Sequence, residues 1–149
     1  MVSKLKMNKT TIKKAKAYVL QLFAYDGRKS LFELSGDNCS EVSRLLALWF
    51  RNTMPSSNIF IAKGKIKKRF HDLILIENNN RIFIIDPTVW QFFRKKRTIY
   101  MGSSQTIKLT MHLLSDIYGG KWSISERVTK YSQKEIIRLK KTIRCNIKN

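Results

Sequence analysis

Cysteine is scarce in this sequence, with two residues among 149. Two cysteines are too few for a disulfide-stapled mini-protein or for a four-cysteine zinc site. Long apolar runs are missing as well: residues 45–50 and 73–76 are among the longest, and they are far too short to span a membrane. Residues 1–30 hold no continuous apolar stretch followed by a small-residue cleavage site, so we expect no secretory signal peptide.

Acidic residues are also few: 10 Asp and Glu stand against 30 Lys and Arg, and the net charge is +20. Residues 31–62 and 71–93 are slightly acidic, whereas residues 1–30, 63–70 and 94–149 carry the positive charge. Such basic segments would bind nucleic acid, an acidic protein or an anionic membrane surface, or would form only a solvated surface. The sequence has no zinc-finger spacing, RNP-like motif or basic region with heptads, which argues against sequence-specific nucleic-acid recognition.

The length and the 43% content of apolar residues are typical of one domain with a single core. Apolar spacing and capping signals predict the helices, and short Ile-, Leu- and Phe-rich segments predict the strands. In chain order they are a helix at 10–25, a helix from about Cys39 to Pro55, strands at 58–62, 70–76 and 81–86, a helix at 107–118 and a helix after Ser132. This order suggests an α+β layer fold.

One predicted helix begins at a cysteine. Asn38 with Glu41 three residues later fits a capping box, which places Cys39 in the first turn of the helix. The amides and the dipole of a helix N-terminus favour the thiolate form, and the thiolate is the nucleophile. Taken alone, Cys39 is better explained as a small buried side chain, which is the usual role of a free cysteine.

A histidine and an aspartate lie on the two strands that follow. If the intervening turn is centred between Asn78 and Asn79, His71 and Asp86 lie directly opposite each other, with Cβ atoms about 4.5–5.5 Å apart. The carboxylate would then fix the imidazole tautomer and leave the other ring nitrogen for a thiol. A three-residue turn would place His71 opposite Pro87 and make the contact diagonal. An accidental cross-strand charge pair is the alternative.

Together, Cys39, His71 and Asp86 have the residue types of a cysteine hydrolase. The oxyanion donors would be the Cys39 backbone N–H and the side chain of Asn38, whose competing role is the helix cap. Cys145 has no acid–base partner nearby in the sequence. Because none of these groups comes in a short paired ligand spacing, we expect no metal, and nothing in the sequence calls for a cofactor.

Three segments resemble the Cys, His and Asp motifs of papain-fold bacterial toxins and effectors, and their glutamine-deamidase members are the most similar. The segments are GDNCSEVSRLLALWF (36–50), HDLILIE (71–77) and RIFIIDPTVWQFF (81–93). In that family a Cys opens the central helix, the His starts a strand, and Asp-Pro-Thr with a nearby Gln-Phe ends the next strand. The matching residues here are Cys39, His71, Asp86, Pro87, Thr88, Gln91 and Phe92.

The resemblance implies a papain-like fold, in which the central helix bearing Cys39 packs on a small antiparallel sheet and further helices lie at both ends of the chain. It implies one cysteine hydrolase domain over residues 1–149 that deamidates a glutamine side chain of a target protein through a thioester. Asn38 and Gln91 would contact the oxyanion or the substrate. A papain-like cysteine protease shares this chemistry, and a non-enzymatic basic module that binds nucleic acid or an acidic protein is a second alternative.

The resemblance also implies a virulence protein that is secreted or delivered without a classical signal peptide and acts in the cytoplasm of the target cell. An acidic immunity or inhibitor protein is the partner that such a toxin would need in its own cell. Catalysis on a neutral carboxamide requires no strong positive field, so we expect the basic ends to bind an acidic partner. The basic patch expected to do so is Lys95, Lys96 and Arg97.

Overall fold

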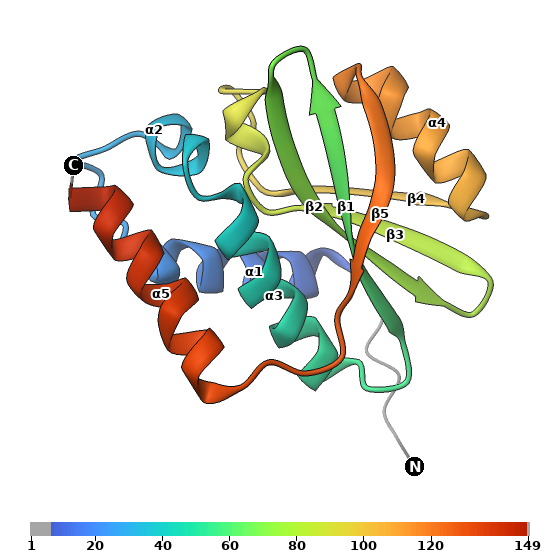
Figure 1. Cartoon of the computed structure of the whole chain (residues 1–149), viewed down its shortest axis with the longest axis horizontal. Helices are drawn as coiled ribbons and strands as arrows, with labels where there is room; N and C mark the ends of the chain where they lie inside the picture. Colours follow the sequence, from blue (N-terminus) through green and yellow to red (C-terminus); the bar gives the residue numbers. More distant parts are fainter. Residues whose placement is uncertain (1–6, 149) are drawn as a thin grey trace.

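The computed structural model describes residues 7–148, and in this range it has five α-helices, a short 3-10 helix and a five-stranded antiparallel sheet (Figure 1). The α+β class expected from the sequence is thereby confirmed. The elements are α1 (Lys9–Leu22), α2 (Leu31–Gly36), α3 (Cys39–Thr53), β1 (Asn58–Ile66), β2 (Arg69–Asn78), β3 (Arg81–Asp86), η1 (Val89–Gln91), β4 (Tyr100–Ser104), α4 (Ile107–Tyr118), β5 (Lys121–Arg127) and α5 (Gln133–Lys148). No helix in the described range is long and apolar enough to cross a membrane.

The sheet has the strand order β4-β3-β2-β1-β5 and is covered on both faces. Helices α1, α3 and α5 lie on one side of it, and α4 lies on the other (Figure 1). Successive residues of a strand point to opposite faces, so Ile74 and Ile76 of β2 join the α3 core while Leu73 and Leu75 join the α4 core. Double coverage explains why residues 73–76 form a continuous apolar run instead of alternating with polar residues.

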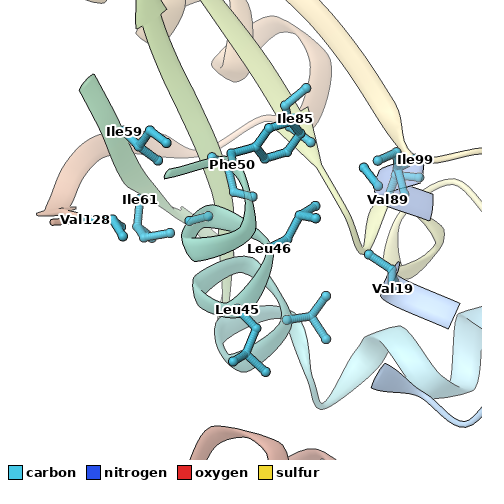
Figure 2. Close-up of a cluster of buried hydrophobic side chains, with 14 of the residues drawn as sticks. Val19, Leu45, Leu46, Phe50, Ile59, Ile61, Ile85, Val89, Ile99 and Val128 are labelled. Atoms are coloured by element: carbon cyan, nitrogen blue, oxygen red, sulfur yellow. The ribbon is translucent and has the colours of Figure 1, made fainter. Parts of the chain in front are cut away.

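The larger core lies between α3 and the sheet. The apolar stripe of α3 places Leu46 and Phe50 toward the strands that carry Ile59 and Ile85, as Figure 2 shows, and Leu45 belongs to the same core. Each of these side chains is at most 1% exposed, and burial of one such side chain stabilises the fold by about 1.5–3 kcal/mol. This packing fixes α3, and with it Cys39 at its first residue, against the central strands.

Several elements were not expected from the sequence. The strands β4 and β5 and the short helix α2 have weak patterns: β4 contains Gly102, and β5 buries Trp122 but exposes both of its neighbours. The two strands pair with β3 and β1 at the edges of the sheet. The expected order of a strand block followed by helices is therefore wrong, because α4 and β5 return to the sheet and complete it.

The expected register of the β2–β3 hairpin is also wrong. Asn78 pairs with Arg81, so the two turn residues are Asn79 and Asn80, with φ of 52° and 61°. These positive φ values are those of a two-residue type I′ turn, which asparagine tolerates better than most residues. Continued to the strand end, the register makes His71 and Asp86 diagonal neighbours. They still share one face, because the shift is by an even number of residues.

The predicted capping box at α3 is absent. Helix α3 begins at Cys39 as expected, but the Asn38 side chain makes no cap hydrogen bond. Its amide group donates to the backbone oxygen of Leu34 at 2.7 Å, and its carbonyl oxygen accepts a hydrogen bond from the Asn146 side chain at 3.0 Å. Asn38 therefore ties the end of α2 and the end of α5 to the start of α3. Ser132, after which a helix was predicted, caps α5: its Oγ atom accepts a hydrogen bond from the Glu135 amide at 3.2 Å.

Candidate active site

The nucleophile candidate lies at a helix N-terminus. Cys39 is the first residue of α3 and is half-buried. The first helical hydrogen bond runs from the Val42 amide to the Asn38 oxygen at 3.0 Å, so the Cys39 amide precedes it and has no intrahelical partner. An N–H group in this position can donate to an oxyanion that forms at the Cys39 sulfur.

The base candidate is held by a carboxylate. His71 Nε2 and Asp86 Oδ2 are 2.8 Å apart, and both side chains are completely buried. The diagonal register brings the two side chains together from neighbouring strands at the end of β3. Exposure therefore decreases from the half-buried Cys39 to the fully buried His71 and Asp86, with the nucleophile nearest to solvent.

The second ring nitrogen of His71 is buried and has no hydrogen-bond partner within the described range. Burial by itself lowers the pKa of His71, but the charge and hydrogen bond of Asp86, together with the Cys39 side chain, raise the pKa to about 10. Since Nε2 is already engaged by Asp86, Nδ1 is the atom left for the thiol. At neutral pH the ring is then an imidazolium between a carboxylate and the cysteine sulfur.

Asp86 is held from two further directions. The Tyr118 hydroxyl donates to the same Oδ2 atom at 2.5 Å, and the Thr88 amide donates to Oδ1 at 3.0 Å. Burial, followed by the charge of Asp86, raises the pKa of Tyr118, so its hydroxyl stays protonated and remains a donor. Tyr118 was not among the residues predicted from the sequence, because nothing in the local pattern of α4 marks a residue that reaches a strand 32 positions earlier.

Three aromatic rings pack around the imidazole of His71. Its ring centroid lies 4.8 Å from Phe92, 5.4 Å from Tyr118 and 6.1 Å from Trp122. Gly64 makes room for Trp122, since a Cβ at that position would lie 2.4 Å from the indole ring. Exclusion of water by these rings strengthens the electrostatic interactions between His71 and its partners.

A separate ion-pair network positions α3 on the other face of β2. Arg44, one turn or so after Cys39, binds Asp72 at 2.8 Å and Glu126 at 3.0 Å. The Ser43 hydroxyl donates to the Asp72 backbone oxygen at 3.0 Å. Asp72 follows His71 directly in the chain, so the network ties the helix of the nucleophile to the strand of the base.

The remaining sequence candidates lie at different distances from this centre. Gln91 is 5% exposed in η1, next to Phe92, and its Oε1 atom has no hydrogen-bond partner in the described part of the chain. The side chains of Lys95, Lys96 and Arg97 are exposed. The backbone oxygen of Lys96 accepts a hydrogen bond from the Trp90 side chain, and that of Arg97 accepts one from the Lys16 side chain.

Two other features do not contribute to the centre. Cys145 is exposed on α5, and no group of three or more metal-ligating side chains occurs among residues 7–148. A cavity of about 980 Å³ lies at the opposite end of the sheet and is lined mostly by uncharged polar side chains such as Asn78, Asn79 and Gln105. It contains neither cysteine nor histidine, so we place the candidate site at Cys39 and His71 and not in that cavity.

Comparison with known proteins found no matching family model, no similar curated protein and no solved structure of similar fold.

Proposed function

We propose that the protein is a papain-like cysteine amidohydrolase and that it deamidates a glutamine side chain of a target protein. The observation that carries the proposal is the buried His71–Asp86 pair, whose second ring nitrogen has no hydrogen-bond partner within residues 7–148 other than the Cys39 side chain that acts on the ring. A buried polar atom without a partner costs about 1–3 kcal/mol. Such an atom next to a half-buried thiol suits a base that exchanges a proton with the thiol and the substrate.

The proposed reaction needs only groups of this chain and water. The Cys39 thiolate attacks the carboxamide carbon, and the negative charge on oxygen is stabilised by the Cys39 amide. The His71 imidazolium then protonates the leaving nitrogen, ammonia departs, and a thioester remains. Water attacks the thioester and transfers a proton to the neutral imidazole. The products are a glutamate side chain and the free Cys39 thiol.

Asp86 and Tyr118 have supporting roles in this scheme. Asp86 holds the His71 ring through Nε2 and stabilises its positive charge, which turns Nδ1 toward the thiol. Tyr118 and Thr88 fix the carboxylate in turn. Asn38 is less suited to the oxyanion role than the Cys39 amide, because both of its polar groups already bind α2 and α5. Gln91 keeps the role of a substrate-side group.

Peptide hydrolysis is the alternative with the same residues. Protease and deamidase share the thiolate, the tetrahedral intermediate and the thioester, and they differ in which nitrogen leaves. The test is incubation of the protein with a glutamine-rich unfolded protein, followed by mass spectrometry and an ammonia assay. Deamidation gives ammonia and intact chains in which Gln has become Glu, whereas a protease gives cleaved chains. Absence of both products with wild-type protein, or equal products with Cys39→Ala, would contradict the proposal.

The biological setting is part of the same proposal. We infer a toxin or effector that acts in the cytoplasm of a target cell and is restrained in its own cell by an acidic inhibitor protein. The exposed side chains of Lys95, Lys96 and Arg97 suit binding to such an inhibitor. Expression of the wild-type chain in a recipient cell should arrest growth, while Cys39→Ala should not.

A further inference from the structure

The hairpin that joins β1 to β2 lies beside the candidate site. Gly64 pairs with His71, Lys65 pairs with Phe70 and Ile66 pairs with Arg69. The tip of the hairpin therefore lies just beyond the Gly64–His71 pair. In Figure 1 the tip stands at the same end of the molecule as the N-terminus of α3, which begins at Cys39.

The tip carries a dense positive charge without counter-ions. Lys65, Lys67, Lys68 and Arg69 are all exposed, and none of them forms a salt bridge within residues 7–148. Four neighbouring cations repel one another, so a purely structural role gives no reason to gather them on one turn. An anionic ligand would relieve this repulsion.

The charge continues into the site through Arg69. Its guanidinium lies 5.8 Å from the ring centroid of Phe92, and Phe92 in turn packs 4.8 Å from the His71 ring. Arg69 also lines a hollow of about 360 Å³ together with Asn38, the residue before Cys39. Arg69 therefore makes one wall of this hollow cationic, although Glu33 and Asp37 also line it.

An apolar contact point stands within the same surface. Phe70 is 57% exposed, and the Lys63 ammonium lies 5.7 Å from its ring centroid. An exposed aromatic side chain surrounded by cations can anchor a peptide. The aromatic ring offers apolar contact area, and the charges steer and orient the approaching peptide.

We propose that the tip of the β1–β2 hairpin, residues 63–70, binds an acidic segment of the protein that carries the target carboxamide. The inference rests on the proposed function and adds a substrate class to it: glutamine side chains next to clusters of Asp or Glu. A protein partner is favoured over nucleic acid because the cationic wall adjoins the groups that would attack a protein side chain.

The test uses two synthetic fluorescent peptides and one matched control variant. Both peptides contain a single Gln; Glu residues flank it in the first, and Ser residues replace them in the second. Binding is measured by anisotropy in a Cys39→Ser background, so that no peptide is consumed. The hairpin variant is Lys65→Glu with Lys68→Glu, and the control is Lys140→Glu with Lys141→Glu on α5, two exposed lysines whose reversal changes the net charge equally.

We expect the acidic peptide to bind the parent protein about tenfold more tightly than the neutral peptide, and added salt to reduce the difference. The hairpin variant should lose this preference, and the α5 variant should keep it. Equal losses in the two variants would overturn the proposal, because net charge alone would then explain binding. Thermal unfolding of each variant verifies that the fold is intact.

Two further measurements separate this inference from the proposed function. Ammonia release by the wild-type protein, expressed as the ratio of kcat/KM for the two peptides, should favour the acidic peptide. Selective binding without any ammonia release would overturn the proposed function and still support the hairpin as an acidic-peptide site. Duplex DNA that binds more tightly than the acidic peptide, with binding abolished by the hairpin variant, would overturn the protein assignment.

Discussion

Two adjacent residues at the start of β2 hold two different buried polar clusters. On the α4 side, His71 joins Asp86 and Tyr118. On the α3 side, Asp72 joins Arg44 and Glu126. The α3-side cluster pairs opposite charges: Arg44 binds two carboxylates, and the second Asp72 oxygen lies 4.0 Å from Lys63. The α4-side cluster leaves His71 Nδ1 without a hydrogen-bond partner among the described residues.

The difference indicates a division of labour. A cluster whose charges are balanced stabilises the docking of α3 on the sheet. Its Asp72 Oδ1 atom also lacks a hydrogen-bond partner among the described residues, but the cluster contains neither a thiol nor an imidazole that could act as nucleophile or base. The α4-side cluster has the Nδ1 atom of His71 next to a thiol and without another hydrogen-bond partner in the described range. That nitrogen remains available for proton transfer. Both clusters include a residue of β2, so the ion pairs of Asp72 help to position the strand that carries His71. The predictions below separate their roles.

The largest effect on activity is expected for Asp86→Asn. The amide can present the wrong hydrogen-bond partner to His71 Nε2, so turnover should fall about 10²–10⁴-fold while the fold remains. Steady-state ammonia release, with circular dichroism as the control for folding, measures the change. Turnover close to that of the wild-type protein would exclude Asp86 from the catalytic machinery.

Arg44→Met should break the α3-side cluster instead. The substitution leaves Asp72, whose side chain is 4% exposed, without its main partner, and removal of one partner of a buried pair costs about 3–5 kcal/mol. Urea unfolding measures the loss in the free energy of unfolding. Arg138→Met is the matched control, because the exposed Arg138–Glu135 pair on α5 should contribute little. A small effect at Arg44, equal to that at Arg138, would refute the positioning role.

Tyr118→Phe tests the hydroxyl that holds Asp86. Loss of a hydrogen bond to a charged group corresponds to about 1.5–3 kcal/mol, so we expect about a tenfold or larger fall in kcat with little change in KM. The pH profile of kcat should shift as well, since Asp86 sets the pKa of His71. Tyr18→Phe, on the α3 side, is the control. A fall in stability alone, with an unchanged pH profile, would assign Tyr118 a structural role.

The last prediction concerns the dependence of stability on pH. The pKa of His71 is raised from 6.5 to about 10 in the folded protein, so protonation of the ring stabilises the fold. This contribution is fully present below pH 6.5 and is lost as the pH rises through about 10. The difference in the free energy of unfolding between wild type and His71→Asn should therefore shrink over that range. A difference that grows with pH would have the wrong sign for an imidazolium.

The sequence was informative where the signals are local. The apolar stripe of α3 and the position of His71 and Asp86 on one face of a hairpin follow from periods of 3.6 and 2 residues. The start of α3 at Cys39 was predicted correctly, but from a capping box that does not form. The register was missed because two adjacent asparagine pairs could each form the turn. An even shift preserved the face, so the error changed a direct pair into a diagonal one.

Long-range contacts could not be predicted in this way. No local pattern marks Tyr118 or Trp122 as a residue that reaches His71, and β5 pairs with β1 although Phe60 and its partner Arg127 lie 67 residues apart. The Arg44–Asp72 pair likewise joins a helix to a strand 28 residues later. These contacts depend on how the helices close over the sheet, which a local pattern does not specify.

The most direct test of the central claim is alkylation of the two cysteines as a function of pH, followed by peptide mapping. Cys145 is exposed and Cys39 is only half-exposed, so access alone favours reaction at Cys145. If His71 activates Cys39, iodoacetamide should modify Cys39 first at neutral pH, and His71→Asn should abolish that lead. Modification of Cys145 first, or reaction of both thiols only above about pH 8.5, the free-thiol value, would contradict the account.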